Sequence, residues 1–598
     1  MTILEKIRGP QDLKKLSLDK MTTLAQEMRQ AILKRDSIVG GHVGPNLGIV
    51  EAAIALHYVF DSPKDKIVWD VSHQSYPHKL LTGRQEGFLT EKGMRRISGY
   101  TNPDESEHDW FKVGHTSTAV SLACGLAKAR DLRDEKHNVV AIVGDGALSG
   151  GEAMEGLSNA AVLGSNIIII INDNEMSIAE NHGGIYSGLR LLRETNGTAE
   201  CNLFKALGFD YHYVADGNSL PQMIEMLQKV KDVNKPTVVH IHTLKGKGYE
   251  LAEKNKEEWH WSVPFNLANG KPKWDMSGEN YNDITYDLLR KKIRKDSSVV
   301  VVNAGTPGAF GLNAQRRRTL GKHFVDVGIA EEHGVAFTSA LAKGGAKPVF
   351  LVMSSFIQRT YDQLSQDLAL NQNPAVVLVA WGGISGADMT HLCSFDISMV
   401  SNIPNMVYLA PTTVEEYSAM LNWAIEQKNY PVVIRMPTNV VHATKAVDKS
   451  YAKLNSYKVE QKGAEVALIA AGNFFTLGQQ VAAEFGKYGI TPTLINPRFL
   501  TGLDSKCLDG LKAKHQLVIT LEDGEIDGGF GEKIARFYGA TDMKVLNYGS
   551  FKEFTDRADV KELYKKYRLV PGLIVDDAFK ALKKQKPKLN RRTKKKIS

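Results

Sequence analysis

Short runs of valine and isoleucine recur along most of the chain, and helix-like segments separate them. The runs do not alternate apolar with polar residues, so they are typical of strands covered on both faces, as in parallel sheets wrapped by helices. The pattern predicts an α/β protein with doubly wound sheets. The clearest runs lie at 138–143, 166–171, 237–243, 298–303, 348–353, 375–381, 431–436, 466–472 and 517–523.

Two stretches interrupt this pattern and indicate domain boundaries. Turn and polar residues replace it at 260–280, and charged residues replace it at 442–465. A chain of 598 residues is long enough to bury several cores. We therefore expect three α/β domains, at 1–270, 280–440 and 460–582, followed by a tail at 583–598.

The tail explains the net charge of the chain. The formal charge is +8, but residues 583–598 hold nine lysines and arginines and no acid, so the rest of the chain carries −1. A run of like charges is usually disordered and solvated. We therefore expect a basic, disordered tail and no specific nucleic-acid partner, although an anionic surface remains an alternative partner for the tail.

Cysteine usage and the N-terminus bear on the compartment. The four cysteines, Cys124, Cys201, Cys393 and Cys507, are scattered without CxxC spacing, which disfavours a disulfide framework or a zinc site. The first twenty residues are charged and contain no apolar signal segment, and no run reaches the ~18 apolar residues of a membrane span. We expect a cytoplasmic protein with no membrane partner.

Polar residues follow two of the predicted strands at the point where each strand ends. Asp145 lies in "VGDGALSGG" (143–151), and Asn174 lies in "NDNEMSI" (172–178). Ligands of doubly wound sheets collect at the carboxyl ends of strands, and Mg²⁺ is commonly held there by a few protein oxygens together with phosphate oxygens. Glycines at 144, 146, 150 and 151 would let backbone approach a diphosphate. A helix cap is the alternative role for Asp145.

This pairing is similar to the signature of thiamin diphosphate enzymes, and the stretch resembles the transketolase superfamily. Further segments narrow the resemblance to the 1-deoxy-D-xylulose-5-phosphate synthases, and it extends from about residue 5 to 580. Those segments include "GGHVGPNLG" (40–48), "GHTST" (114–118), "KGKGY" (245–249), "DVGIAEEH" (326–333) and "SSFIQR" (354–359). The resemblance implies a pyrophosphate-binding domain, a pyrimidine-binding domain and a C-terminal domain, in that order, and a homodimer.

The resemblance also implies how the cofactors are held. Mg²⁺ would be bound by the side chains of Asp145 and Asn174 and by the carbonyl oxygen of Met176. Thiamin diphosphate would contact His73, His115, Thr116, Ser117, Gly144, Gly146, Ala147, Asn174, Lys245, Glu331 and Phe356. Phe356 would stack on the aminopyrimidine, although a phenylalanine after an apolar strand is more often a core residue.

Glu331 matches the family carboxylate that lies against N1′ of the aminopyrimidine. Sharing a proton at N1′ favours the tautomer whose exocyclic nitrogen can take the proton from C2 of the thiazolium. An exposed glutamate would do this poorly, so we expect an apolar environment that raises the pKa of Glu331. Without the resemblance, a solvated helix face would be the simpler interpretation of this residue.

Two histidines are candidates for protonating the oxygen derived from the acceptor, because imidazoles suit proton transfer near neutral pH. These are His42 and His391, and any histidine in these motifs could instead be a structural donor. Asp388 is expected beside His391 as a catalytic and substrate-binding residue. Arg359 and Tyr361 are expected to bind substrate. The reaction implied is condensation of pyruvate, with loss of CO₂, and an aldehyde.

The chain departs from the family pattern where the acceptor would bind. Family members usually read DRAG after the strand at 375–381, whereas this chain reads AWGG and has Trp381 in place of the arginine. Thr438 replaces a second arginine, and the loop "GADMTH" (386–391) is one residue shorter than usual. Losing two hydrogen bonds to a charged phosphate would cost about two to four decades of affinity. Basic side chains such as Arg435 could compensate.

Three functions are consistent with these residues. The first is the synthase itself, with glyceraldehyde 3-phosphate as acceptor. The second is a related thiamin-dependent carboligase or ketol transferase with another donor or acceptor. The third is a non-catalytic relative that binds cofactor or a protein partner, but retention of Asp145, Asn174 and Glu331 argues against it.

Overall fold

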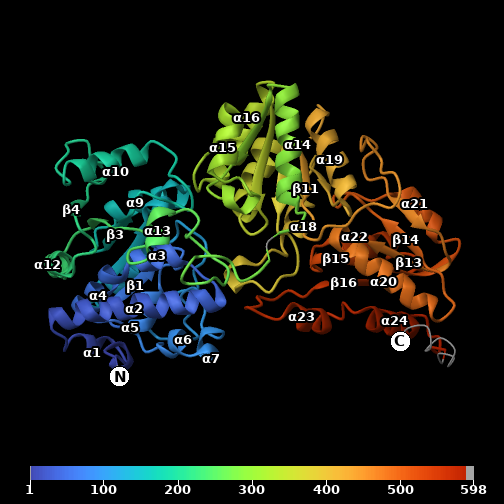
Figure 1. Ribbon diagram of the computed structural model, residues 1–598. Coiled ribbons are helices and arrows are strands. Elements are labelled where there is room, and N and C mark those ends of the chain that lie inside the picture. Colours follow the sequence, from blue (N-terminus) through green and yellow to red (C-terminus); the bar gives the residue numbers. More distant parts are fainter. Residues whose placement is uncertain (1, 276, 588–598) are drawn as a thin grey trace. The chain divides into compact units, whose positions relative to one another are not determined.

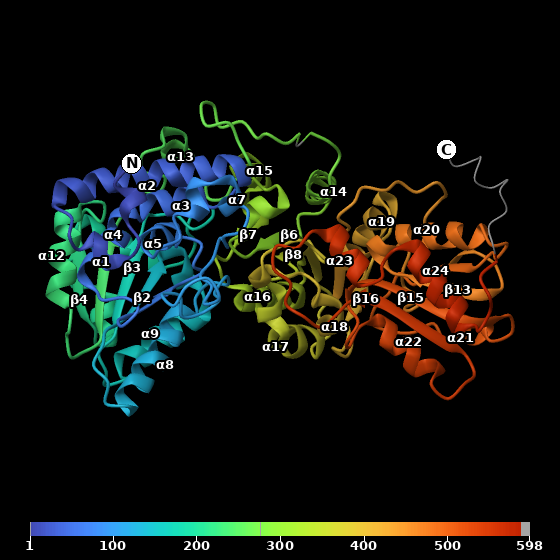
Figure 2. The ribbon, with the colours of Figure 1, turned by 90° about the horizontal axis from the view of Figure 1, so that it is seen from below.

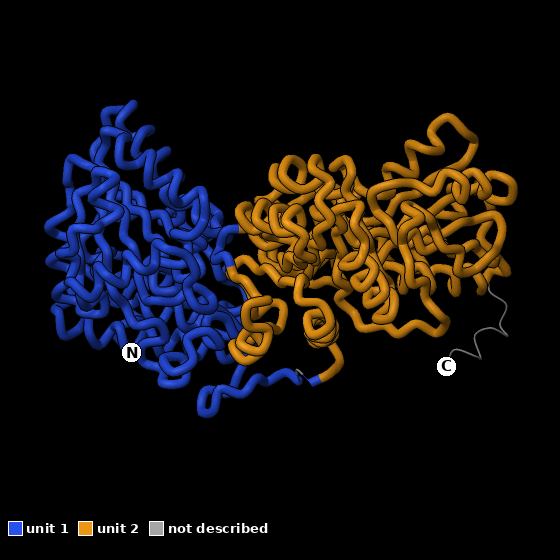
Figure 3. Tube along the Cα trace, turned by 90° about the horizontal axis from the view of Figure 1, so that it is seen from above, with its two compact units in different colours: residues 1–277, 327–330 blue, residues 278–326, 331–598 orange. Residues whose placement is uncertain are grey.

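The computed structural model describes residues 2–275 and 277–587. Residues 588–598, the larger part of the predicted basic tail, lie outside the described residues. The chain forms two compact units (Figure 3). Unit 1 comprises residues 1–277 and 327–330, and unit 2 comprises residues 278–326 and 331–598.

Unit 1 contains a five-stranded sheet in the order β1-β2-β3-β5-β4, and all its pairs are parallel. Figure 1 labels three of its strands, β1, β3 and β4. The strands are β1 (Lys66–Trp69), β2 (Val139–Gly144), β3 (Ile168–Asp173), β4 (Asp210–Val214) and β5 (Thr237–His242). The helices are α1 (Pro10–Leu13), α2 (Leu18–Val39), α3 (Val43–Gly48), α4 (Val50–Val59), α5 (Tyr76–Leu81), α6 (Glu86–Leu89), α7 (Glu91–Met94), α8 (Ala119–Leu132), α9 (Gly151–Ala161), α10 (Ile185–Glu194), α11 (Leu203–Leu207), α12 (Leu220–Val230) and α13 (Glu250–Lys254).

Strand β2 shows why its sequence does not alternate. Val140 and Ile142 belong to the core formed with α2, α4 and α12, whereas Ala141 and Val143 belong to the core formed with α8 and α9. Helices therefore cover both faces of the strand, and successive residues of the run are buried alternately against one helical layer and the other. The prediction of a doubly wound parallel sheet is confirmed here.

Unit 2 contains two sheets. The first has the order β10-β11-β9-β8-β6-β7 and is parallel throughout. Its strands are β6 (Val299–Asn303), β7 (Phe324–Asp326), β8 (Lys347–Met353), β9 (Val376–Ala380), β10 (Val407–Leu409) and β11 (Val432–Arg435). Its helices are α14 (Tyr281–Lys295), α15 (Ala314–Leu320), α16 (Glu331–Lys343), α17 (Tyr361–Gln363), α18 (Asp396–Val400) and α19 (Val414–Glu426).

The second sheet of unit 2 has the order β12-β14-β13-β15-β16. Helices α20 and α24 lie on one face of it and α22 on the other (Figure 2). The strands are β12 (Lys458–Gln461), β13 (Glu465–Ala470), β14 (Thr493–Asn496), β15 (His515–Glu525) and β16 (Lys544–Ser550). The helices are α20 (Phe475–Gly486), α21 (Ser505–Leu511), α22 (Phe530–Tyr538), α23 (Val560–Lys566) and α24 (Pro571–Ala581).

One strand of this sheet departs from the expected parallel arrangement. β12 pairs antiparallel with β14, whereas the other pairs of the sheet are parallel. β12 is an edge strand whose side chains are half-buried and exposed in turn, so its sequence lacks the continuous apolar run of a central strand. Within the described residues, no helix is long and apolar enough to cross a membrane.

Candidate active site

The two polar motifs of unit 1 meet at the carboxyl edge of the first sheet. Asp145 directly follows β2, Asn174 directly follows β3, and these two strands are parallel neighbours. Both side chains are buried. Asp145 is the first residue of a short 3₁₀ turn (Asp145–Ser149), after the N-cap residue Gly144. The sheet topology therefore places a carboxylate and an amide at one edge, as ligands of a cation require.

Asp145 lies in an environment that disfavours its own charge. Burial, followed by the nearby carboxylate of Asp173, raises the pKa of Asp145 to about 8. Its oxygens accept hydrogen bonds from the Gly146 N–H at 2.9 Å and from Asn181 Nδ2 at 3.0 Å. A buried carboxylate of this kind is stabilised most by a bound cation.

Asn174 supplies the second observation that fits a metal ion. Its Oδ1 atom is buried, and no donor within the described part of the chain reaches it. Buried polar atoms normally have a partner, so an unpartnered amide oxygen beside a buried carboxylate matches the oxygen donors that Mg²⁺ takes. Met176 lies in the turn after Asn174, where its backbone forms an isolated antiparallel β-bridge with that of Glu180.

The glycine-rich turn after β2 is held by two serines. A Cβ at Gly150 would lie 2.1 Å from Ser117 Oγ, and one at Gly146 would lie 2.9 Å from Ser177 Oγ, so both positions need glycine. Ser117 Oγ donates to the Ala147 carbonyl at 2.9 Å and lies 2.8 Å from Thr116 Oγ1. A Cβ at Gly144 would meet nothing within 4 Å, which leaves open space beside this turn.

Two of the predicted histidines, His42 and His73, cluster with His260 in unit 1. The ring of His42 lies 5.0 Å from that of His73 and 5.5 Å from that of His260, measured between centroids. Lys245 Nζ lies 3.2 Å from His260 Nδ1 and donates to the Ser177 carbonyl at 2.6 Å. Burial lowers the pKa of Lys245 to about 7, against the opposing effect of Asp145.

Glu331 is the first residue of α16 in unit 2, and the prediction that its environment raises its pKa is confirmed. Burial raises the pKa of Glu331 to about 7, and the Arg359 guanidinium opposes this shift from a distance of 3.9 Å. Across residues 2–275 and 277–587, no donor forms a hydrogen bond with Glu331 Oε2. The carboxyl group can therefore accept or hold a proton at a nitrogen of a bound ring.

Phe356 and His391 lie together after strands β8 and β9. Their rings make an edge-to-face contact with centroids 5.8 Å apart. Burial lowers the pKa of His391 to about 4, so the neutral imidazole is its form at neutral pH. Tyr361 is partly exposed, and its hydroxyl donates to Asn402 Oδ1 at 2.8 Å.

Residues 381–391, here called the β9 loop, contain both Asp388 and Trp381. Asp388 accepts hydrogen bonds from the N–H and the hydroxyl of Thr390 and so caps a short 3₁₀ turn that carries His391. Trp381 is 53% exposed and has a φ of 64°, which is uncommon for a bulky residue. Thr438 lies after β11, and its N–H donates to Asn473 Oδ1 at 3.0 Å.

Arg435 does not offer the compensating charge considered above. Its guanidinium is buried and forms ion pairs with both Asp396 and Asp523. The buried guanidinium is already neutralised by these two carboxylates, so it does not present an exposed cation to a substrate phosphate. The alternative that Arg435 compensates for the missing arginines is therefore wrong.

Some site residues escaped the sequence analysis. Asn181 contacts Asp145 directly, and Asp70 accepts hydrogen bonds from the N–H groups of Ser117 and Ala119. Asp173 accepts from Arg193 and His240, which outweigh the effect of burial and lower its pKa to about 2. Asp70 lies at the end of β1 as Asp145 does at the end of β2, and this shared position is the signal that could have identified it.

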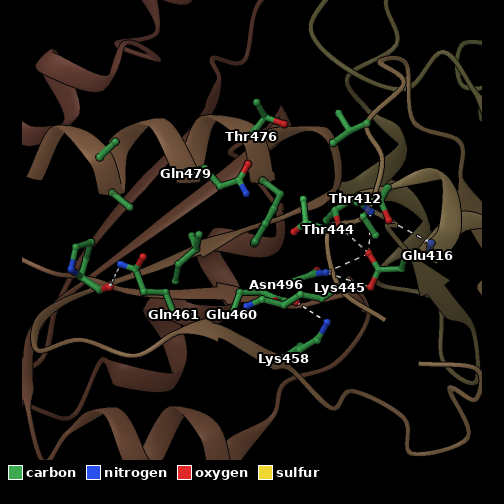
Figure 4. Close-up of a pocket in the computed structure, with 18 of the residues that line it drawn as sticks. Thr412, Glu416, Thr444, Lys445, Lys458, Glu460, Gln461, Thr476, Gln479 and Asn496 are labelled. Carbon is green, nitrogen blue, oxygen red and sulfur yellow. Dashed lines mark hydrogen bonds and ion pairs between the residues drawn. The ribbon is translucent and has the colours of Figure 1, made fainter. Parts of the chain in front are cut away.

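A separate cavity of about 720 Å³ lies in unit 2 between α20, β12 and the segment 441–447 (Figure 4). Thr476 and Gln479 line it from α20, and Lys458 and Glu460 from β12. None of the predicted site residues lines it. It is thus distinct from the strand ends described above.

Family models match three consecutive parts of the chain. Residues 4–202 and 193–243 match a family described as 1-deoxy-D-xylulose-5-phosphate synthase, residues 279–442 match the transketolase pyrimidine binding domain, and residues 455–574 match the transketolase C-terminal domain. Among solved structures, a transketolase from Pichia stipitis aligns with 94% of this chain and 98% of its own at 16% identity and a TM-score of 0.45.

Curated relatives extend over nearly full length. A 1-deoxy-D-xylulose-5-phosphate synthase from Caldanaerobacter subterraneus is 36% identical over 98% of this chain and 100% of its own length. Proteins of the same name from Natranaerobius thermophilus and Symbiobacterium thermophilum are each 37% identical, over 89% and 95% of this chain and 90% and 93% of their own lengths.

The domain matches and the parallel α/β sheets define an enzyme of the transketolase superfamily, a transferase. Within that class, the chain belongs to the 1-deoxy-D-xylulose-5-phosphate synthase family.

Proposed function

We propose that this protein catalyses the condensation of pyruvate, with loss of CO₂, and glyceraldehyde 3-phosphate to 1-deoxy-D-xylulose 5-phosphate, with thiamin diphosphate and Mg²⁺ as cofactors. Family membership supports the reaction. The observation that carries it is the buried Glu331, whose pKa is raised to about 7. A protein that only bound a partner would have no use for such a group.

The residues of unit 1 would hold the metal and the diphosphate. Asp145 and Asn174 would ligate Mg²⁺ through side-chain oxygens, and Met176 through its carbonyl. The diphosphate would lie against the open side of Gly144 and the N-terminus of α9, within reach of Lys245. The other residues proposed to contact the cofactor here are His73, His115, Thr116, Ser117, Gly146 and Ala147.

Bound thiamin diphosphate supplies the nucleophilic carbon and the electron sink that decarboxylation needs. Glu331 would hold a proton at N1′ of the aminopyrimidine, and its raised pKa suits a group that holds a proton at neutral pH. Phe356 would stack on the ring. Both follow strands of the same parallel sheet, where ligands of such sheets collect.

On the substrate side, His42 is the proposed acid for the acceptor-derived oxygen. His391 would act as a neutral hydrogen-bond donor, because burial holds its pKa at about 4, and Asp388 would fix the turn that carries it. Arg359 and Tyr361 would contact substrate. A homodimer and a cytoplasmic location remain predictions from the sequence.

The alternative acceptor deserves a test because Trp381 is exposed and Arg435 is fully paired. The full-length relatives favour the phosphorylated aldehyde. CO₂ release from pyruvate is measured with thiamin diphosphate and Mg²⁺, with either glyceraldehyde 3-phosphate or glyceraldehyde added. Stimulation by the phosphorylated aldehyde is expected, and equal or absent stimulation by the two aldehydes would reject the proposed acceptor.

A further inference from the structure

A buried charge cluster joins the two sheets of unit 2, and the proposed chemistry does not use it. Arg435, the last residue of β11, donates from Nε to Asp396 at 2.7 Å and from Nη2 to the same carboxylate at 3.1 Å. Its Nη1 pairs with Asp523 of β15. Asp396 also accepts from the Tyr408 hydroxyl. All four side chains are buried.

The β9 loop begins directly on this cluster. A Cβ at Gly382 would lie 2.6 Å from Arg435 Nε, and one at Gly383 would lie 2.9 Å from Asp523 Oδ2. The backbone therefore packs on the guanidinium and the carboxylate at a distance that only glycine permits. Gly383 has a φ of 139° and donates its N–H to the Cys393 carbonyl at 2.8 Å, which closes the loop.

The same cluster reaches the second position at which an expected arginine is replaced. Asp523 Oδ2 accepts from Asn473 Nδ2 at 2.8 Å, and Asn473 Oδ1 accepts from the Thr438 N–H at 3.0 Å. Trp381 is thus linked to Arg435 through its neighbour Gly382. Thr438 is linked to Asp523 through the side chain of Asn473. Two positions that are far apart in sequence share one support.

The second half of the β9 loop also contacts residues that follow β16, the last strand of the second sheet of unit 2. Arg557 donates its N–H to the Ala387 carbonyl at 2.9 Å, and a Cβ at Gly386 would lie 2.6 Å from the Ala558 carbonyl oxygen. The loop that carries Asp388 and His391 is therefore supported at both ends by the C-terminal part of the chain.

We propose that Arg435 is a positioning residue that, paired with Asp523 across the two sheets, fixes the backbone of the β9 loop and thereby sets the affinity for the acceptor aldehyde. This proposal rests on the function proposed above. Arg435 itself touches no substrate in this scheme. The C-terminal domain acquires a defined task, which is to hold an acceptor-binding loop that belongs to the preceding domain.

The conservative change Arg435→Lys tests this role. Lysine keeps the charge but lacks the planar fork that bonds two carboxylates and underlies the glycines. A displacement of about 1 Å in a binding loop can cost about a hundredfold, so we expect the KM for glyceraldehyde 3-phosphate to rise about tenfold or more. The KM for pyruvate and the acceptor-independent release of CO₂ should stay within about twofold, because they do not need the loop.

Arg498→Lys is the matched control. Arg498 is also buried, donates to Asp448 at 2.5 Å and to the Ser456 carbonyl at 3.0 Å, and makes these contacts away from the β9 loop. Both variants are assayed below their thermal midpoints. The same rise in acceptor KM in both variants, or an equal rise for pyruvate and acceptor in Arg435→Lys, would overturn the proposal.

A second readout does not depend on catalysis. Acrylamide quenching of Trp381 is obtained by subtracting the emission of Trp381→Phe, in the wild-type and the Arg435→Lys backgrounds. Quenching of Trp381 should increase when the loop loses its support, and unchanged quenching would contradict the proposal. If the wild-type protein forms no 1-deoxy-D-xylulose 5-phosphate, the proposed reaction fails, but this measurement still decides whether Arg435 positions the loop.

Discussion

The carboxyl ends of β2 and β3 in unit 1 and those of β9 and β11 in unit 2 are organised differently. In unit 1, Asp145 is fixed by Gly146, its neighbour, and by Asn181, 36 positions later. In unit 2, Arg435 pairs with Asp523, 88 positions later and in another sheet. The proposed metal and diphosphate residues are thus supported by contacts within unit 1, whereas the proposed acceptor side depends on a second sheet and its domain.

This difference has a consequence for specificity. The diphosphate side is held by contacts inside unit 1, such as those of Asp70 with Ser117 and of Lys245 with Ser177. The backbone of the β9 loop is held by the C-terminal domain. Residues of the loop can therefore change without altering the position of Glu331. Within the same domain, Trp381 departs from the family pattern and is exposed, whereas Glu331 matches the pattern and is buried.

The largest effect is expected at Glu331, the buried carboxyl group proposed to act at the aminopyrimidine. Glu331→Gln removes the ionisable group without changing its size, and turnover should fall about 10²- to 10⁴-fold because proton transfer at the ring is lost. Steady-state rates and thiamin diphosphate titration are measured together. Cofactor affinity should be retained, and Glu332→Gln, one residue on, should keep both; a fully active Glu331→Gln enzyme would refute the assignment.

The second prediction concerns Asp145 as the proposed Mg²⁺ ligand in unit 1. Asp145→Asn should weaken Mg²⁺-dependent binding of thiamin diphosphate about a hundredfold or more, since second-shell changes alone typically cost 10- to 100-fold. Asp65→Asn is the control, because Asp65 is a similarly buried carboxylate before the first residue of β1, where it accepts hydrogen bonds from the Asn138 and Asp61 N–H groups. It should lower the melting temperature and leave cofactor affinity nearly unchanged. Equal loss of affinity in both variants would remove the distinction between ligand and support.

A third change examines the β9 loop itself. Trp381→Arg would restore a cation at an exposed position, and one hydrogen bond to a phosphate is worth about 1.5–3 kcal/mol, or one to two decades in affinity. The KM for glyceraldehyde 3-phosphate should fall by that factor, and the KM for unphosphorylated glyceraldehyde should not change. A parallel fall for both aldehydes would show that the site does not recognise the phosphate through this position.

The smallest effect concerns stability and pH in the cofactor-free protein. Burial raises the pKa of Glu331 from 4.5 to about 7, so the folded state holds a proton that the unfolded state releases, and this linkage contributes to folding stability. That contribution is present below pH 4.5 and is lost as the pH rises to 7.

Melting curves of the wild type and Glu331→Gln measure this contribution directly. The variant should be the more stable protein above pH 7, by about 5 °C, and the difference should vanish near pH 4.5. Burial also raises the pKa of Glu522 to about 7, but this residue is present in both proteins and cancels in the difference. A constant difference across this range would mean that Glu331 is not the titrating group.

Much of the fold could be predicted from sequence because burial on both faces leaves a direct mark. The continuous apolar runs correspond to β2, β3, β5, β6, β8, β9, β11, β13 and β15. The edge strand β12 leaves no such mark, since water covers part of it, and its antiparallel pairing was not anticipated. Polarity at an edge is indistinguishable from a loop in a sequence pattern.

The site divides in the same way. The position of Asp145 and Asn174 at neighbouring strand ends follows from the parallel topology, and the raised pKa of Glu331 follows from the apolar residues before it. The pairing of Arg435 with Asp523 could not be inferred, because nothing in a β-strand sequence specifies a partner in a different sheet. Compensation by Arg435 was an open alternative in the sequence because its burial against Asp396 and Asp523 leaves no mark there.

The most direct test of the central claim is product formation from [2-¹³C]pyruvate and glyceraldehyde 3-phosphate with thiamin diphosphate and Mg²⁺. We expect 1-deoxy-D-xylulose 5-phosphate labelled at its keto carbon, identified by mass and ¹³C NMR, from the wild-type protein but not from Glu331→Gln. Absence of this product from the wild type would refute the proposed reaction, and undiminished formation by the variant would refute the role of Glu331.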